Sequence, residues 1–215
     1  LPHLQGLTEN SVQIVWTTSK PAIAWVELAP DDSSHFYLKD RPKFFNNQYG
    51  FKSVGTVHSV HLKDLSPNTT YRYRIYSQEV TDHVRNNVTY GRVVATNVYT
   101  QAPLKFTTLG KKEQFNFTVI NDIHGRNDVM NKLLDVADVN KTDFVIFNGD
   151  MADNLLSEKQ MYDAFMDTAI KRFASEKPLY YSRGNHETRG PFAIEYPKYF
   201  PTPTGELYYA LNYGE

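Results

Sequence analysis

The chain has no cysteine among its 215 residues, which excludes disulfide scaffolds, thiolate zinc sites and cysteine nucleophiles. It also lacks an excess of one charge, because 23 Lys and Arg residues are balanced by 24 Asp and Glu residues. That balance provides no basic surface for nucleic acid and no polybasic patch for a membrane. No apolar run approaches the ~18 residues that a membrane-spanning helix requires.

The length fits one large domain or two ordinary ones. Charged residues make up 22% of the chain, which is typical of a globular protein. Aromatic residues make up 14%, mostly 15 Tyr and 13 Phe, and these residue types favour strands. The hydrophobic pattern changes near Gly110, so we predict two domains, residues 1–110 and 111–215.

The first half shows alternating apolar residues with a period of two. Val12, Ile14 and Trp16 fall on one face of a strand. Turn residues separate several such runs and no helical period appears, which predicts a β-sandwich. The segments 30–56 and 78–102 are expected to be long loops, and the histidines of this half to lie at the surface or at strand edges. The predicted strands are 12–16, 23–28, 57–62, 71–76 and 104–107.

A tyrosine at a strand start sharpens this prediction. Tyr71 follows the Pro67 turn in the segment Leu-Ser-Pro-Asn-Thr-Thr-Tyr. In immunoglobulin-like sandwiches such a tyrosine bonds back to the upstream backbone. Together with Trp16, the segment resembles a fibronectin type III domain, and the resemblance spans about residues 3–109.

The second half alternates strands with helices. Segments 115–120, 144–147 and 179–181 read as strands, and the continuous apolar run of the second fits a strand buried on both faces. A β-α-β-α-β order predicts a mostly parallel sheet with right-handed crossovers.

Two helices are predicted between these strands. Ser157 is a candidate N-cap with Glu158 in the first turn. Apolar residues at helical spacing define one face for each helix. These residues are Val129, Leu133, Val136 and Ala137 in the first helix, and Met161, Phe165, Ala169 and Phe173 in the second.

Each of the three strands runs into ligand-type side chains. Asp122 and His124 follow the first, Asp150 the second and Asn185 the third. Ligands in open α/β sheets bind outside the carboxyl ends of the strands. Asp122 and His124 are two residues apart, so in an extended chain both side chains point the same way. Asp150 carries two oxygens and can bridge two cations.

The motifs differ in how specific they are. Asp-x-His alone is usually a cap beside a surface histidine, and Gly-Asp alone is usually a turn. Gly-Asn-His-Glu, residues 184–187, is rarer. All three in order, each after a predicted strand, indicate a metal site rather than chance. Mixed imidazole and carboxylate ligands fit Mn, Fe, Zn or similar divalent ions.

At these residues the chain resembles the calcineurin-like metallophosphoesterase superfamily. With a fibronectin-like domain in front, the branch it resembles is that of the purple acid phosphatases. The resemblance implies two divalent metal ions (Fe, Zn or Mn) and a role for each residue. Asp122 and His124 are implied as ligands of the first metal, Asp150 as the bridging ligand and Asn185 as a ligand of the second metal. His186 is implied as the group that contacts the phosphate and helps the leaving oxygen depart, and Glu187 as a residue behind the ligands that orients His186.

One departure from the family pattern concerns the metal ligands. Purple acid phosphatases carry a Tyr three residues after the bridging Asp, and its charge transfer gives the colour. Here that position is Asp153, and His124 stands where these enzymes usually lack a His. Both changes agree with an uncoloured metallophosphoesterase site.

A second departure concerns the end of the sequence. The superfamily completes its site with a further His and a Gly-His-x-His block, and no His follows His186. We therefore expect about half of the catalytic domain to be absent, with weak metal binding and little turnover by this chain alone.

The resulting hypothesis is a hydrolase of small phosphate esters, in which a metal-bound hydroxide attacks phosphorus in line and His186 stabilises or protonates the leaving group. The family resemblance implies a place outside the cytoplasm, secreted or periplasmic. One alternative is a non-catalytic binding or structural module whose sandwich is the working part. Another is that two chains pair and complete each other's sites.

Overall fold

The structure is a computed structural model that describes residues 1–202 and 204–213. The chain forms two compact units. We call them the sandwich unit, which contains Leu1–Pro2 and Thr8–Gly110, and the α/β unit, which contains His3–Leu7 and Lys111–Glu215. The assignment of His3–Leu7 to the second unit has no counterpart in the sequence pattern.

The sandwich unit is built from antiparallel strands. Strand β2 pairs with β3, β6 and β7, and β7 also pairs with β8 and β9. The elements are β2 (Val12–Pro30), the 3-10 helix η1 (Phe36–Leu38), β3 (Lys43–Phe45), β4 (Asn47–Gln48), β5 (Phe51–Lys52), β6 (Gly55–Leu62), β7 (Thr70–Val84), β8 (Asn87–Ala95) and β9 (Leu104–Thr107). The predicted β-sandwich followed by an α/β domain is confirmed as the fold class.

Strand β2 replaces two predicted strands. Its first part pairs with β6 continuously up to Thr17 and once more at Ala22 after a register shift, and its second part pairs with β7 from Ala22 onward. Pro21 lies at this change of partner and is exposed, so its missing N–H removes no hydrogen bond from a central ladder. A proline that looks like a strand break therefore lies within one long strand.

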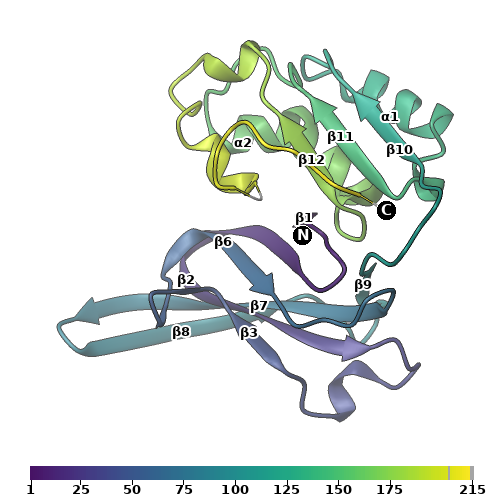
Figure 1. The fold of residues 1–215 in the computed structure, drawn as a ribbon. Coiled ribbons are helices and arrows are strands. Elements are labelled where there is room, and N and C mark those ends of the chain that lie inside the picture. The colour runs from purple at the N-terminus through teal and green to yellow at the C-terminus, as the bar shows by residue number, and fades with distance from the viewer. Residues whose placement is uncertain (203, 214–215) are drawn as a thin grey trace. The chain divides into compact units, whose positions relative to one another are not determined.

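The prediction of a long loop over 78–102 is wrong for most of that segment. The last part of β7 and all of β8 form a hairpin, which Figure 1 shows extending past the other strands of its unit. Val84 pairs with Asn87 across a two-residue turn in which Arg85 has a φ of 57°. Most side chains near the tip are exposed on both faces, so the sequence lacks the alternation that marks a half-buried strand.

The predicted tyrosine corner is confirmed. The Tyr71 hydroxyl accepts a hydrogen bond from the Ser66 N–H at 2.9 Å. Tyr71 stands at the start of β7, so this bond joins the Pro67 turn to the strand that follows it.

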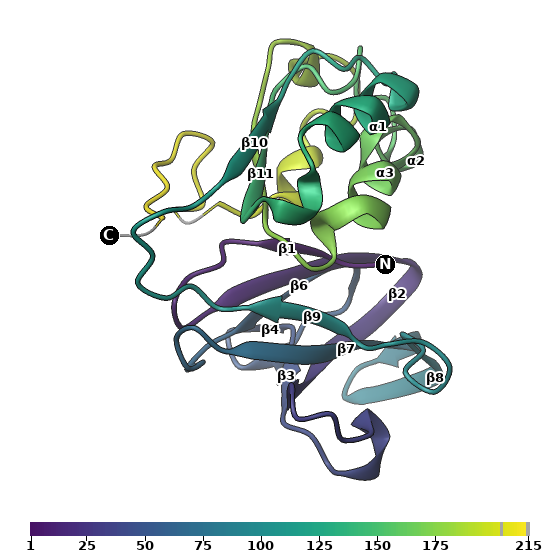
Figure 2. The same ribbon diagram turned by 90° about the vertical axis from the view of Figure 1, so that its right-hand side faces the viewer.

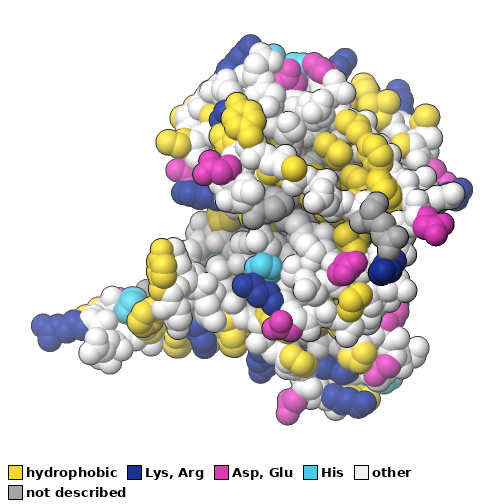
Figure 3. All heavy atoms as spheres, in the orientation of Figure 1, with side chains coloured by type: hydrophobic (Ala, Val, Ile, Leu, Met, Phe, Trp, Pro, Cys, Tyr) yellow, Lys and Arg dark blue, Asp and Glu magenta, His cyan; other side chains and the backbone are white. Residues whose placement is uncertain are grey.

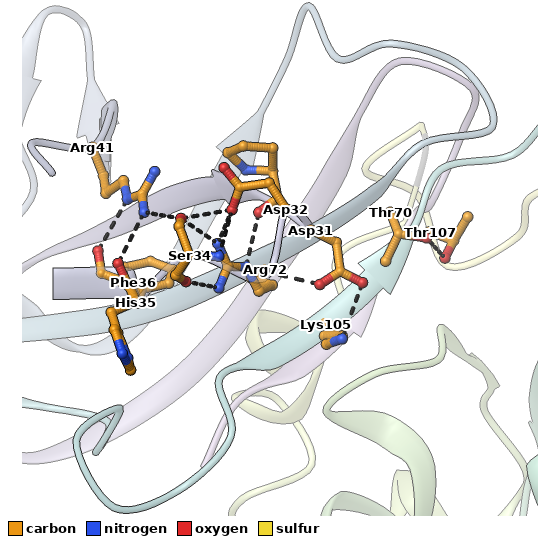
Figure 4. A network of polar contacts seen from close by, with 11 residues as sticks. Asp31, Asp32, Ser34, His35, Phe36, Arg41, Thr70, Arg72, Lys105 and Thr107 are labelled. Carbon is orange, nitrogen blue, oxygen red and sulfur yellow. Dashed lines mark hydrogen bonds and ion pairs between the residues drawn. The ribbon is translucent and has the colours of Figure 1, made fainter. Parts of the chain in front are cut away.

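A buried arginine secures the segment after β2 (Figure 4). Arg72 on β7 donates to the Pro30 carbonyl at 2.8 Å and to the Asp32 carboxylate at 2.7 Å. Asp31, which lies 3.9 Å from the same guanidinium, accepts from Lys105 on β9 at 3.0 Å. A buried charge is tolerated when it is paired and hydrogen-bonded, so these contacts hold the loop after β2 against β7 and β9.

The α/β unit contains the predicted parallel sheet, in the order β10-β11-β12. Its strands are β10 (Phe117–Ile120), β11 (Phe144–Asn148) and β12 (Leu179–Ser182), and β1 (His3–Gln5) adds a parallel bridge between Leu4 and Pro178. The helical elements are α1 (Asn127–Val136), η2 (Val139–Lys141), α2 (Glu158–Met161), η3 (Tyr162–Met166), α3 (Asp167–Ala169), η4 (Ile170–Ala174), η5 (His186–Thr188) and η6 (Tyr196–Tyr199).

The helices α1, α2 and α3 lie on one side of β10 and β11, as Figure 2 shows. On the other face, Phe117 and Val119 are about half exposed, at 50% and 48%. Figure 3 shows hydrophobic side chains gathered over β10 and β11 on this face. The ring of Tyr213 packs there against Phe144, with centroids 4.5 Å apart. None of the helices in the described ranges has the length and hydropathy of a membrane span.

The helical run after β11 follows the prediction closely. Ser157 caps it, because its hydroxyl accepts from the Gln160 N–H at 3.2 Å. The four apolar residues of its predicted face are buried. Two π-helical stretches, η3 and η4, interrupt the α-helix. Their wider turns explain how residues spaced by four stay on one face, since an α-helix has about 3.6 residues per turn.

The predicted buried face of α1 is wrong. Met130 and Leu134 are fully buried, whereas Leu133 is 42% and Val136 is 87% exposed. Two overlapping apolar stripes run along this helix, one residue apart. Packing against the sheet selects one stripe, and the spacing of apolar residues within the helix does not distinguish them.

We predict that the sandwich unit loses stability on acidification because of His58, which is buried and not at the surface as expected. Burial lowers the pKa of His58 from 6.5 to about 4, so the unfolded chain binds a proton more readily than the folded one. The free energy of unfolding falls as the pH drops from about 6.5 towards 4, by up to about 3 kcal/mol.

Urea unfolding followed by the fluorescence of Trp16, whose ring lies 5.5 Å from that of His58, measures this effect. His58→Gln reduces the dependence of stability on pH. Equal pH dependence in both proteins would contradict the assignment. His83→Gln serves as a control, because His83 lies on the exposed hairpin of the same unit.

Candidate metal centre

The loops that follow β10 and β11 carry the first predicted site residues, and they run side by side. Asp122 N–H donates to the Gly149 carbonyl at 3.2 Å, and His124 N–H donates to the Asp150 carbonyl at 3.1 Å. Gly125 N–H donates to the Met151 carbonyl at 2.9 Å. The hydrogen-bond pairing of β10 with β11 thus continues into the two loops that follow them and sets the distance between these loops.

Three of the predicted ligand residues have left-handed backbone conformations. The φ angles are 56° for Asp122, 52° for His124 and 55° for Asp150. Residues other than glycine adopt this region rarely and at some cost in free energy. The expectation that an extended chain aligns Asp122 with His124 is wrong. The turn brings them together instead, with His124 Nε2 3.7 Å from Asp122 Oδ1.

Two glycines let the loops after β11 and β12 meet. A Cβ on Gly149 would lie 2.6 Å from the Gly184 backbone, and one on Gly184 would lie 2.3 Å from Asp150 Oδ1. Neither position has room for a side chain. The absence of side chains there allows the backbone of one loop to approach the Asp150 carboxylate in the other.

Glu187 joins the same two loops. Its buried carboxylate accepts hydrogen bonds from the backbone N–H groups of Asp150, Met151 and Gly184 at 2.9, 2.8 and 2.9 Å. The Tyr181 hydroxyl adds a fourth at 2.7 Å. Burial, with the Glu187 charge beside it, raises the pKa of Tyr181 well above its usual value, which keeps this hydroxyl a donor. We expected Glu187 to orient His186. Its contacts position the Asp150 loop instead.

The structure brings three of the predicted side chains into one cluster. Ligand atoms of His124, Asp150 and His186 all lie within 4.8 Å of one another. The two imidazole rings meet edge to face, with centroids 4.5 Å apart. His186 N–H also donates to Asp150 Oδ1 at 2.9 Å. Two imidazoles and a carboxylate at this spacing form a donor set suited to a first-row divalent ion.

Asn185 lies beside Asp150. The near end of its amide lies 3.0 Å from Asp150 Oδ2. The position therefore provides a second place where a carboxylate oxygen and an amide oxygen can converge on one cation. Asp122 and Asn185, the other two predicted ligands, lie next to this group, Asp122 beside His124 and Asn185 beside Asp150.

Asp153 contacts both histidines. The sequence marks this residue only as a departure from the family pattern, where a Tyr is usual, and gives no sign of these contacts. Its carboxylate lies 2.7 Å from His124 Nδ1, and its backbone carbonyl lies 2.9 Å from His186 Nδ1. Both oxygens accept, so both imidazoles carry a proton on Nδ1 and leave Nε2 free. Carboxylates that hold ligand histidines in this way are a common feature of metal sites.

Comparison with known families agrees with this geometry. Residues 115–214 match the family model described as calcineurin-like phosphoesterase. Residues 2–108 match the model of the purple acid phosphatase N-terminal domain. The two matches follow one another along the chain and together give the domain order of a purple acid phosphatase.

Two individual relatives match most of the chain. The purple acid phosphatase PPD1 from yellow lupin (Lupinus luteus) seeds superposes with a TM-score of 0.70 at 18% identity, over 99% of this chain and 43% of that one. A curated Arabidopsis thaliana protein called "Probable inactive purple acid phosphatase 1" is 28% identical over 86% of this chain and 32% of its own length. The chain thus spans about a third of that curated relative.

The contacts of Glu187 predict a large loss of stability in Glu187→Gln. The substitution removes the charge and turns an NH2 group toward backbone donors, which leaves buried groups unsatisfied at a cost of about 3 kcal/mol or more. Thermal unfolding monitored by circular dichroism measures this. Glu113→Gln, at an exposed position, serves as the control. Equal melting temperatures for the two variants would contradict the role of Glu187.

The two contacts of Asp153 predict weaker metal binding in Asp153→Ala. The substitution frees the imidazole of His124 to rotate and change tautomer, and we expect a loss of about 10–100-fold in metal affinity. Titration calorimetry with Mn²⁺ measures it. Asp163→Ala, which removes an exposed carboxylate paired with Lys159, is expected to bind like the parent. The same affinity in both variants would show that Asp153 does not support the site.

Proposed function

We propose that the chain carries part of the active site of a metal-dependent phosphoesterase that hydrolyses small phosphate esters. The observation that supports this most is the cluster of His124, Asp150 and His186 at the strand ends of a calcineurin-like domain. Divalent ions bound at such a centre lower the pKa of coordinated water and neutralise charge on a phosphoryl group.

Asp150 has the central position in this proposal. Its Oδ1 accepts from the His186 N–H, and its Oδ2 faces Asn185. The close approach of Gly184 prevents the carboxylate from swinging away. A bridging ligand between two metal ions has to be fixed in this way, since small displacements change both coordination spheres. Asp122 and His124 would complete the first ion's protein ligands and Asn185 would serve the second.

His186 supplies the proton chemistry. The Asp153 carbonyl holds its Nδ1 proton, so Nε2 is the atom that exchanges a proton with the leaving oxygen of the substrate. An imidazole positioned in this way contributes typically about 10²–10⁴-fold to a rate. His186 also belongs to the group of possible metal ligands, so the leaving group would depart beside the metal centre.

We infer two ions of Fe, Zn or Mn, because the donors are a mixture of imidazole, carboxylate and amide oxygen. The residues described here provide too few ligands to fill two coordination spheres. In this proposal further nitrogen ligands come from outside these 215 residues, consistent with the greater length of the curated relative. A location outside the cytoplasm, which the resemblance implies, stays a prediction.

The second candidate is a non-catalytic module, in which the sandwich unit does the binding. The name of the curated relative, which includes the word "inactive", favours it. The two candidates share the metal cluster and differ in turnover.

Para-nitrophenyl phosphate hydrolysis by a protein that contains this chain together with the further ligands, before and after metal removal, tests the enzyme proposal. We expect activity that is lost with a chelator, restored by Mn²⁺ or Zn²⁺, and reduced at least about 100-fold in Asp150→Asn, since a bridging charge contributes several kcal/mol. Asp128→Asn, at an exposed position of α1, is expected to be as active as the parent.

Metal binding without turnover in that longer protein would favour the non-catalytic module. Metal-independent hydrolysis, or full activity in Asp150→Asn, would contradict both the site and the mechanism.

A further inference from the structure

Arg189 lies at the edge of the metal centre, and its backbone is fixed on both sides. Its N–H donates to the His186 carbonyl at 3.0 Å, and its own carbonyl accepts from the Leu155 N–H at 2.9 Å. The next residue, Gly190, has no room for a side chain, because a Cβ would lie 2.2 Å from the Leu155 carbonyl oxygen. The guanidinium therefore projects from a rigid turn directly after the Gly-Asn-His-Glu segment.

The guanidinium reaches two site residues. Nη2 lies 2.9 Å from the outer end of the Asn185 amide. Nη1 lies 3.3 Å from His186 Nδ1. The carbonyl of Asp153 is closer to Nδ1 and can only accept, so Nδ1 bears a proton. Arg189 therefore gains no hydrogen bond from His186, and its polar contact with the centre is the one to Asn185.

The Asn185 amide thus lies between an acceptor and a donor, Asp150 Oδ2 at 3.0 Å and Arg189 Nη2 at 2.9 Å. Which end carries the oxygen follows from these neighbours. With nitrogen toward Asp150 and oxygen toward Arg189, both ends form hydrogen bonds. In the opposite orientation the amide oxygen faces the Asp150 carboxylate and the amide NH2 faces the Arg189 guanidinium, so neither end forms a hydrogen bond.

A cation shared by Asp150 and Asn185 requires that opposite orientation, because only the amide oxygen can be a ligand. The amide NH2 then faces the guanidinium, donor against donor, and Arg189 has to move away. The hydrogen bond from Arg189 and metal ligation by Asn185 therefore exclude each other.

We propose that Arg189 is a positioning residue that holds Asn185 turned away from the second metal position until a cation displaces it. This inference rests on the proposed function, in which Asn185 is a metal ligand. When the cation binds, the guanidinium is released beside His186, where a substrate phosphate would lie. Because coupling between sites is reciprocal, an anion that engages the released arginine strengthens metal binding.

A double-mutant cycle on Arg189 and Asn185 tests the inference, with Mn²⁺ affinity of the full chain measured by titration calorimetry. Loss of the charge-assisted hydrogen bond in Arg189→Met is expected to tighten Mn²⁺ binding about tenfold. In the N185A background the same change is expected to have a clearly smaller effect, because only the general loss of positive charge remains. Arg189→Lys, which keeps a cationic donor, restores the parent affinity, and Arg183→Met is the control for an exposed arginine outside these contacts.

The side-chain amide resonances of Asn185, assigned by their absence in N185A, provide a second readout. Without metal, their chemical shifts are expected to differ between the parent and Arg189→Met. With saturating Zn²⁺, which is used in place of Mn²⁺ because it is diamagnetic, they are expected to move further. If Arg189→Met leaves the affinity unchanged, or changes it equally in both backgrounds, the role of Arg189 is wrong while the proposed function stands. If Asn185→Ala itself leaves the affinity unchanged, Asn185 is not a ligand and the proposed second metal position fails.

Discussion

The carboxylate of Glu187 is the contact on which the rest of the metal centre depends. It is fully buried and accepts from the backbone of Asp150, Met151 and Gly184 as well as from Tyr181. These donors belong to the ends of two parallel strands, β11 and β12. A single buried charge therefore fixes the loops that carry both the central carboxylate and the Gly-Asn-His-Glu segment. Its donors compensate for the cost of burying it.

This arrangement explains why the unusual backbone conformations persist. Left-handed residues such as Asp122, His124 and Asp150 are stable only where the surroundings hold them. Here consecutive backbone hydrogen bonds tie the loop after β10 to the loop after β11, and Glu187 ties the latter to the loop after β12. The sandwich unit uses a similar device, in which buried Arg72 is saturated by carbonyl and carboxylate oxygens. In both units a buried charge determines the path of a loop.

The elements that were predictable from the sequence are those with a local signal. The Ser157 cap, the Tyr71 corner and the three parallel strands depend on neighbouring residues or on short periodicities, and all were confirmed. The buried stripe of α1 and the solvated hairpin of β7 and β8 depend on what each segment packs against. The contacts of Asp153 with the two histidines and of Glu187 with the Asp150 loop were missed for the same reason, because these partners lie about 30 or more residues away in the chain. Spacing predicted which strand ends carry ligands but not the turns that bring them together.

Anomalous X-ray diffraction from crystals of the chain soaked in Mn²⁺ tests the central claim most directly. We expect a peak within about 2.0–2.3 Å of ligand atoms of His124 and Asp150. The nearby Asn185 amide should have its oxygen toward a second, weaker peak on the other side of Asp150. A manganese peak elsewhere on the surface, with none between His124 and Asp150, would contradict the assignment of these strand ends as a metal centre.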